Sequence, residues 1–220
     1  LWLTDHQMNA QVSEEFGQNF IRLPLNKSAR IVHGNALRLD WNTVIAASEC
    51  DVVMGNPPFI GAKFLNDAQR TDVAAIFHDT KNAGLLDYVT CWYRKATDYI
   101  AAHPAIRAAF VSTNSITQGE QVGVLWPDLL RRGVHIHFAH RTFQWSSEAS
   151  GKAAVHCVII GFGLYEATQK TIFEYENIQG EAHAVTVKNI NPYLVDAVNI
   201  MLNNREKPIC NVPVIGIGNK

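Results

Sequence analysis

The middle of the chain alternates short apolar segments with longer segments of helical period. Residues 50–55 (CDVVMG) indicate a short buried strand, and residues 106–116 (IRAAFVSTNSI) indicate another. Between them, residues 66–78 and 86–103 carry apolar side chains at the spacing of helices. Strands that alternate with helices in this way predict a parallel sheet in an α/β fold.

The following segments extend this pattern. A helix is predicted within residues 122–133, starting around Trp126, with Pro127 in its first turn and Gly133 just beyond its end. Residues 134–143 and 153–163 then form two strands joined by a short polar stretch. Two strands joined directly predict an antiparallel hairpin at the edge of the sheet.

The two ends of the chain differ from its middle. Residues 1–17 have apolar positions at roughly helical spacing, and the first residue is not methionine. Residues 29–37 (ARIVHGNAL) indicate a strand followed by a turn. From residue 166 onward, short strand-like pieces are separated by Gly and Pro. We therefore predict one domain over residues 1–165 and an extended arm over residues 166–220.

Composition and charge narrow the functional classes. The 220 residues are 47% hydrophobic and 18% charged, which is typical of a soluble globular protein. The net charge is −1, so no strongly basic surface for phosphate groups is expected. The apolar runs are too short to span a membrane, and no signal peptide is visible. The 4 cysteines are scattered without a CxxC spacing, which predicts reduced thiols and a cytoplasmic protein.

The histidines do not indicate a metal site. His135 and His137 alternate on one predicted strand, and His156 lies on another. No HExxH or Cys/His ligand pattern accompanies them. The sequence therefore predicts that no metal is bound.

The stretch after residues 50–55 is the most unusual local feature. Asn56, Pro57, Pro58 and Phe59 come directly after the predicted strand. Two consecutive prolines remove two backbone donors, fix two φ angles and hold the residues before them extended or in a turn. Ligands of open α/β sheets bind beyond the carboxyl ends of strands. A rigid turn is the simpler explanation, but this position favours a functional site.

Asn-Pro-Pro-Phe after a hydrophobic strand resembles the catalytic motif of amino-group DNA methyltransferases, above all the adenine-N6 enzymes that use S-adenosylmethionine. The resemblance extends over most of residues 1–163 and implies a Rossmann-like class I methyltransferase sheet. It implies that the Asn56 side-chain oxygen and the Pro57 carbonyl accept the two N–H groups of the adenine amine. Pro58 would help to hold this corner rigid, and Phe59 would offer a flat apolar face to an extruded base.

Two further segments carry the resemblance. HGNALRLDW is similar to the motif that contacts the adenine of the cofactor, which implies that Asn35, Ala36 and Leu37 bind S-adenosylmethionine. The family usually has Asp where this chain has Asn35, and Asn keeps an acceptor but loses the charge. TFQWSSEASGK is similar to the motif whose aromatic residue packs on the base. Phe143 is the first candidate for that role and Trp145 the second, the alternative being a hydrophobic residue at a strand end.

Two elements of a complete methyltransferase are missing from the sequence: the glycine-rich loop and the acidic residue for the ribose hydroxyls. The most closely spaced glycines lie in the segments 161–163 and 216–218. Neither segment opens a helix, and both indicate turns. The resemblance therefore implies an incomplete sheet that lacks its first strands. The resemblance is most specific to one branch of this family, the large bacterial restriction enzymes that fuse nuclease, methyltransferase and target-recognition regions. Such a piece is expected to bind the cofactor weakly or not at all and to transfer no methyl group alone.

Several alternatives remain open from the sequence. Methyltransferases with the same motif also act on RNA or on a protein glutamine, and a non-catalytic α/β interaction module is a third possibility. None of the cysteines follows a proline, which disfavours cytosine-C5 chemistry. Double-stranded DNA is the expected partner, held by a downstream recognition domain, and Lys63, Arg141 and Lys152 are candidates for phosphate contacts.

Overall fold

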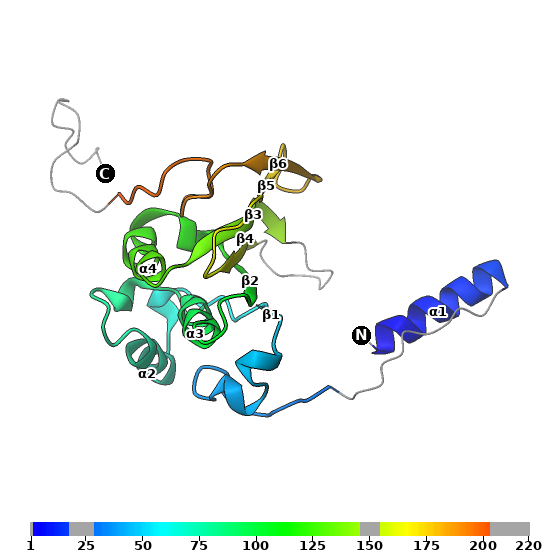
Figure 1. The fold of residues 1–220 in the computed structure, drawn as a ribbon, viewed down its shortest axis with the longest axis horizontal. Coiled ribbons are helices and arrows are strands. Elements are labelled where there is room, and N and C mark those ends of the chain that lie inside the picture. The colour runs from blue at the N-terminus through cyan, green and yellow to red at the C-terminus, as the bar shows by residue number, and fades with distance from the viewer. Residues whose placement is uncertain (1, 18–28, 146–154, 203–220) are drawn as a thin grey trace. The chain divides into compact units, whose positions relative to one another are not determined.

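The computed structural model describes residues 2–17, 29–145 and 155–202. The chain divides into two units, Leu1–Gly34 and Asn35–Lys220. The described part of the first unit consists mainly of α1 (Trp2–Phe16), which confirms the helix predicted at the start of the chain (Figure 1). No helix in the described ranges is long and apolar enough to span a bilayer.

The second unit is built on a six-stranded mixed sheet with the order β1-β2-β4-β3-β5-β6. The pairs β1–β2 and β3–β5 are parallel, and the other neighbouring pairs are antiparallel. The strands are β1 (Val52–Gly55), β2 (Arg107–Thr113), β3 (His135–Trp145), β4 (Val155–Gly163), β5 (Lys170–Tyr175) and β6 (Ala182–Val187).

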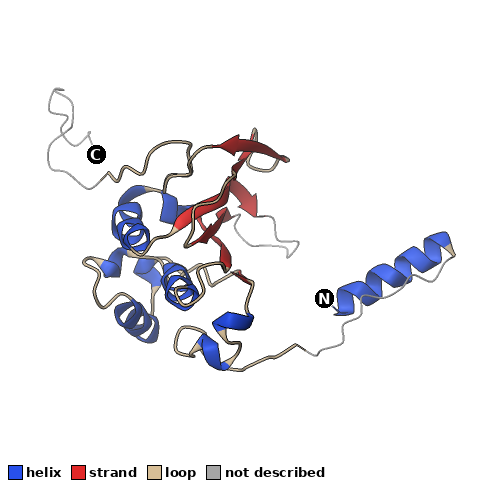
Figure 2. Cartoon of the chain, viewed as in Figure 1, coloured by secondary structure: helices blue, strands red, loops and turns tan. Residues whose placement is uncertain are grey.

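Three helices lie together on one side of this sheet (Figure 2). They are α2 (Asp67–Ile76), α3 (Thr90–Ile100) and α4 (Gly119–Arg131). Helix α2 begins with a capping box, in which Asn66 and Gln69 each accept a hydrogen bond from the other's backbone N–H. Short 3₁₀ turns occur at Trp41–Thr43, Ala47–Glu49, Ala62–Phe64, Ala83–Leu85 and Asn114–Thr117.

The core lies between the sheet and these helices. Along β2, Ala108, Phe110 and Ser112 are buried, whereas the residues between them are half-exposed. The Tyr93 ring of α3 stacks on Phe162 of β4 with centroids 5.4 Å apart, and its hydroxyl hydrogen-bonds Ser112 at 2.7 Å. The alternation follows from the period of two in a strand, which sends successive side chains to opposite faces. Within this unit, no described helix covers the second face.

An aromatic cluster occupies part of this second face. His140 of β3 stacks on Phe173 of β5 with centroids 4.2 Å apart. Phe143 stacks on Tyr175 at 5.4 Å, and the Tyr175 hydroxyl hydrogen-bonds His140 Nδ1 at 2.8 Å. Phe138 packs over Gly161, where any Cβ would collide with its ring. The glycine pair at residues 161–163 therefore lies inside β4 rather than in the turn that we expected.

The strand predicted over residues 29–37 does not form. Ile31 is 88% exposed, and residues 29–34 have no strand partner among the described residues. The strand predicted as buried at residues 50–55 is present as β1, but Met54 is 79% exposed. Residues 29–34 belong to the first unit, whereas Met54 is accessible because β1 is the terminal strand of the described sheet and has no neighbour on its outer edge among the described residues.

The hairpin of β3 and β4 is confirmed, but it does not lie at the edge of the sheet. Ile172 and Phe173 of β5 pair with Ala139 and His140, so β5 and β6 continue the sheet beyond β3. Residues 170–187 are thus part of the sheet rather than of an extended arm. The final stretch of the expected arm, residues 203–220, lies outside the described residues.

Helix α4 begins earlier than predicted. It starts at Gly119 and continues through Pro127, because Val122 and Leu125 of its first half are buried in the core. Its predicted end is confirmed, since Gly133 adopts a left-handed φ of 86°. This conformation lets the N–H groups of Gly133 and the next residue bond back to the last turn of the helix.

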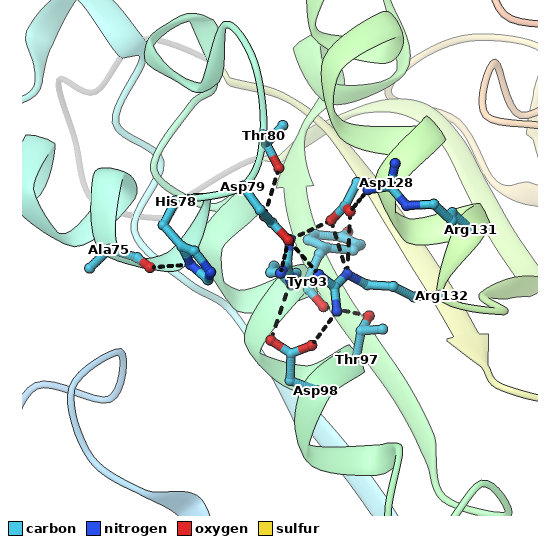
Figure 3. Close-up of polar contacts among 11 residues, drawn as sticks. Ala75, His78, Asp79, Thr80, Tyr93, Thr97, Asp98, Asp128, Arg131 and Arg132 are labelled. Carbon is cyan, nitrogen blue, oxygen red and sulfur yellow. Dashed lines mark hydrogen bonds and ion pairs between the residues drawn. The ribbon is translucent and has the colours of Figure 1, made fainter.

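A partly buried ion-pair network, centred on the buried Arg94 and Asp128, joins α3 to α4 (Figure 3). The Arg94 guanidinium, which is buried, donates to Asp128 at 2.6 Å and to Asp79 at 3.2 Å, and its Nε donates to Asp98 at 3.3 Å. Arg132 contacts the same three carboxylates at 3.0–3.2 Å. Because Asp128 is also buried, these cations keep its charge from being isolated in the protein interior.

We predict that Arg94→Met lowers the free energy of unfolding by about 3 kcal/mol, because the buried Asp128 carboxylate loses the one buried cation among its three arginine partners, Arg94, Arg131 and Arg132. Urea denaturation followed by circular dichroism measures this change. Arg141→Met is the matched control, since Arg141 forms an exposed pair with Glu174 at 3.0 Å and its removal should cost roughly 0.5 kcal/mol or less. Equal losses in the two variants would contradict the assignment.

The network also predicts how stability depends on pH. Hydrogen bonds from Arg94 hold the pKa of Asp79 well below its ordinary value. A depressed folded-state pKa contributes stability above the unfolded-state pKa, about 4, and this contribution is lost as the pH falls through the folded-state pKa. The urea midpoint should therefore fall more steeply from pH 5 to pH 2 in the unmodified protein than in Arg94→Met.

Candidate active site

The Asn-Pro-Pro-Phe segment lies directly beyond the carboxyl end of β1. Asn56 and Pro58 are exposed, Pro57 is buried and Phe59 is half-buried. Strand β1 ends at Gly55 because prolines cannot continue the hydrogen bonding of a ladder. Strands β1, β2 and β3 run in the same direction, so their carboxyl ends meet at one edge of the sheet. The segment therefore occupies the edge where α/β sheets bind ligands.

Asn56, Pro57 and Pro58 line a pocket with a volume of about 360 Å³. Among the described residues, neither the Asn56 side chain nor the Pro57 carbonyl has a hydrogen-bond partner. The rest of the wall is mostly apolar and includes two tryptophans: Trp41, Val53, Met54, Gly55, Trp92 and Phe110. Two unpaired acceptors beside an apolar wall suit a flat ligand that carries N–H donors.

Asp87 anchors the loop that follows these residues. One of its carboxylate oxygens accepts the backbone N–H of Ala62 at 2.9 Å. The other accepts the hydroxyl of Ser115 at 2.5 Å and that of Thr113 at 3.3 Å. The buried Asp87 thus connects the loop after β1 with the end of β2. No local sequence pattern marks it, because its partners lie about 25 residues away on either side.

Asp87 also lines a larger pocket, with a volume of about 890 Å³. Its wall includes Lys63 and Arg70 as well as Asn114 and Gln118. Lys63, one of the three candidates for phosphate contact, is therefore exposed beside the loop. Of the other two, Arg141 pairs with Glu174, as described above, and Lys152 lies outside the described residues.

The segment predicted to bind the cofactor forms a tight turn. The Asn35 side-chain oxygen accepts the N–H of Leu37 at 2.9 Å, and its amide nitrogen donates to Asp72 at 3.1 Å. Asn35 is exposed and Ala36 is half-buried. The Leu37 side chain, by contrast, belongs to the core, and its carbonyl accepts a hydrogen bond from Lys95 Nζ at 2.8 Å. Leu37 thus has both of its backbone polar groups in internal hydrogen bonds.

Trp41 connects this segment to the smaller pocket. Its indole N–H donates to the Ala36 carbonyl at 2.8 Å, and its ring lines the pocket together with Asn56. Trp92 of α3 lies in the same wall and packs edge-on against Tyr88 with centroids 5.3 Å apart. Sequence reasoning missed both tryptophans, although the aromatic residue that ends HGNALRLDW was a possible signal.

The two candidates for base stacking lie elsewhere on the same edge. Phe143 is half-buried in the aromatic cluster near the end of β3. Trp145 pairs with Val155 through the backbone, and its side chain lies outside the described part. Strands β2 and β4 separate β3 from β1, which places Phe143 three strand spacings, or about 14 Å, from the Asn56 strand. The structure thus does not bring Phe143 into contact with the proline corner.

The histidines and cysteines have structural environments. His137 occupies a bulge of β3, hydrogen-bonds the Tyr165 carbonyl at 2.9 Å, and has its pKa lowered by burial. His135 contacts Glu166 at 2.6 Å. In the described ranges, no three His, Cys, Asp or Glu side chains are grouped as a metal site requires. Cys50, Cys91 and Cys157 are free thiols.

Comparisons with known proteins agree with this geometry. The family model described as "MmeI, DNA-methyltransferase domain" matches residues 1–174. A DNA methyltransferase A of Bacillus subtilis (strain 168) is 41% identical over 224 residues, which cover 100% of this chain and 25% of that protein. The Type IIL restriction-modification enzyme MmeI, solved in complex with DNA, is 54% identical with a TM-score of 0.86, and the match covers 97% of this chain and 28% of MmeI.

This chain thus spans about a quarter of the length of these relatives. The match to the MmeI structure confirms the predicted fold class, an α/β sheet consistent with an incomplete Rossmann-like methyltransferase. The matched residues include the proline corner after β1 and the hairpin of β3 and β4. This chain belongs to the family of MmeI DNA-methyltransferase domains.

Proposed function

We propose that this chain forms the base-side catalytic region of a restriction-modification enzyme that methylates N6 of adenine in double-stranded DNA. The observation that carries the proposal is the rigid corner beyond β1. There, the Asn56 side chain and the Pro57 carbonyl have no hydrogen-bond partner among the described residues and line a pocket of about 360 Å³. Membership of the MmeI family supports DNA, rather than RNA or a protein glutamine, as the substrate.

The chemistry follows from the poor nucleophilicity of an aromatic amine, whose lone pair is delocalised into the ring. If the Asn56 oxygen and the Pro57 carbonyl accept its two N–H bonds, the nitrogen becomes pyramidal and the lone pair is freed. These acceptors also stabilise the positive charge that develops on nitrogen as the new N–C bond forms. Pro57 and Pro58 fix the acceptors before the substrate arrives, so little ordering is needed in the reaction.

The target base must leave the duplex to reach this corner. Phe59 is half-buried next to the acceptors and is proposed to contact the face of the extruded base. Phe143, or alternatively Trp145, is proposed as a second stacking partner from the end of β3. Because β1 and β3 are about 14 Å apart, Phe143 is proposed to contact the bound DNA from the far side of the site rather than beside Asn56.

The cofactor proposed is S-adenosylmethionine, which when bound supplies a methyl group on a positively charged sulfur. Trp41 and Trp92 offer an apolar wall for it, and the turn at Asn35 and Ala36 is tied to that wall by the hydrogen bond from the Trp41 indole to the Ala36 carbonyl. Leu37 holds the turn on the core rather than contacting the ligand through its backbone. The glycine-rich loop and the ribose-binding acid do not occur in this sequence, so the chain presents only one side of the pocket.

The enzyme proposed is a longer polypeptide that contains this chain. Its remaining parts are proposed to complete the cofactor pocket and to recognise the DNA sequence through a separate domain after the methyltransferase region. A cytoplasmic location belongs to this proposal, because the DNA substrate of such a bacterial enzyme is there.

We predict that Asn56→Ala in the longer polypeptide lowers the rate of DNA methylation at least about 100-fold, because one of two acceptors for the amine is removed. Transfer of radioactive methyl groups to DNA measures the rate, and DNA affinity should stay within about threefold. Asn177→Ala, in the exposed turn between β5 and β6, is the matched control and should methylate normally. Normal methylation by Asn56→Ala would leave the non-catalytic module as the better explanation.

A second prediction concerns cofactor binding. Isothermal titration of S-adenosylmethionine into the isolated chain should show no binding at micromolar concentrations, because half of the pocket is absent. The longer polypeptide should bind it in the same assay. Micromolar affinity of the isolated chain would contradict the prediction, and methylation of RNA or of a protein by the longer polypeptide, but not of DNA, would overturn the proposed substrate.

A further inference from the structure

Asp72 of α2 is a buried carboxylate with three donors around it. It accepts hydrogen bonds from Asn35 Nδ2 at 3.1 Å, Arg38 Nε at 2.7 Å and the Tyr88 hydroxyl at 2.7 Å. Two of these donors, Asn35 and Arg38, belong to the turn that follows residue 34, and the third lies just before α3. Asp72 thus ties an exposed turn to the helical layer of the protein.

The charge state of this group is well defined. Burial raises the pKa of Asp72, but the hydrogen bonds from Arg38, Tyr88 and Asn35 outweigh burial and lower it below its ordinary value. Burial and the neighbouring carboxylate raise the pKa of Tyr88 to about 12. At neutral pH Asp72 is therefore an anion that can only accept, and Tyr88 is a phenol that donates to it.

This arrangement fixes the orientation of the Asn35 amide. An amide has a donor end and an acceptor end that are nearly equal in shape, so its neighbours decide which end faces which way. Asp72 can only accept, which holds the Asn35 nitrogen toward α2. The Leu37 N–H can only donate, which holds the Asn35 oxygen on the other side at 2.9 Å. That oxygen keeps a second lone pair, and Asn35 is exposed to solvent.

We infer that Asp72 is a positioning residue, which orients Asn35 so that the amide oxygen can accept a hydrogen bond from the 6-amino group of the cofactor's adenine. The inference rests on the proposed function, because it takes the turn at Asn35 as part of the cofactor pocket. Asp72 itself does not touch the ligand in this scheme. By fixing the Asn35 amide, Asp72 selects a cofactor with an amino group. If the Asn35 amide were rotated, it would present N–H donors to that amino group instead of an acceptor.

A second consequence concerns which of the two positions, 35 and 72, carries the carboxylate and which carries the amide. Replacing Asn35 by aspartate would place two carboxylates about 3 Å apart, the separation of the present hydrogen bond, and like charges at that distance repel strongly. Exchanging the two residues restores a hydrogen bond of opposite polarity, in which an amide on α2 donates to a carboxylate in the turn. The Tyr88 hydroxyl, which bonds the same Asp72 oxygen, then accepts the second N–H of that amide. The acceptor toward the ligand is then an oxygen again. The exchanged pair should therefore function where the single variants do not.

The test uses the longer polypeptide with Asp72→Asn, Asn35→Asp and the exchanged pair, which carries both substitutions. Each single variant should raise KM for S-adenosylmethionine about tenfold, the factor expected from one lost hydrogen bond, with kcat changed less than about threefold. The exchanged pair should return KM to within about threefold of the unmodified enzyme. Asp67→Asn, an exposed carboxylate on the same helix, is the matched control and should change neither constant.

A ligand comparison separates positioning from support of the fold. The probes are S-adenosylhomocysteine and its analogue that lacks the 6-amino group, used as inhibitors. The unmodified enzyme should prefer the amino-bearing inhibitor by about tenfold, and Asp72→Asn should lose this preference. A variant that is only less stable would have a lower Tm but an unchanged preference, and that result would overturn the inference.

The two proposals fail in distinguishable ways. If the proposed function is wrong, the unmodified polypeptide itself neither binds S-adenosylmethionine nor methylates DNA. If only the inference about Asp72 is wrong, the unmodified enzyme is active and the three variants keep its preference for the 6-amino group. Should Asp72→Asn alone not fold, Asn35→Asp and the exchanged pair decide the matter, because the like-charge contact is present in the first and absent in the second. Equal KM values for S-adenosylmethionine in these two variants would overturn the inference.

Discussion

The packing of α3 against β2 and β4 is the interaction on which the rest of the second unit depends. Tyr93 stacks on Phe162 and fixes the helix on the sheet. The residues on either side of Tyr93 then reach three other parts of the molecule. Trp92 lines the smaller pocket, Arg94 joins α4 through the carboxylates, and Lys95 holds the Leu37 carbonyl. A shift of this one helix would therefore disturb the core and the candidate site together.

The candidate site is assembled from segments that are distant in sequence. The proline corner follows a strand, whereas the turn at Asn35 has no strand of its own among the described residues. Trp41 brings the two together, because it bonds the Ala36 carbonyl and lines the pocket of Asn56. The buried carboxylates of Asp72 and Asp87 accept hydrogen bonds from these segments on their inner side. The two exposed loops are thus held in place by hydrogen bonds to the helical layer.

Much of the fold could be predicted from local patterns, such as the strand that becomes β2, the hairpin and the helix stop at Gly133. The rest depends on partners that no local pattern reveals. The parallel pairing of Ile172 with Ala139 turned an expected arm into two strands. The proline corner was visible because its chemistry is written in consecutive residues. The role of Asp72 was not visible in the sequence, because its hydrogen-bond donors are distant along the chain. Arg38 and Asn35 lie 34 and 37 positions before it, and Tyr88 lies 16 positions after it.

The second face of the sheet carries apolar and aromatic side chains that remain half-exposed, and Met54 at its margin is largely accessible. Accessible apolar surface promotes association in water when it is gathered in a patch. A preparation of this chain alone should accordingly form soluble oligomers or precipitate as its concentration rises. Weaker association of the longer polypeptide would then indicate that another part of it shields that surface, independently of any catalytic measurement.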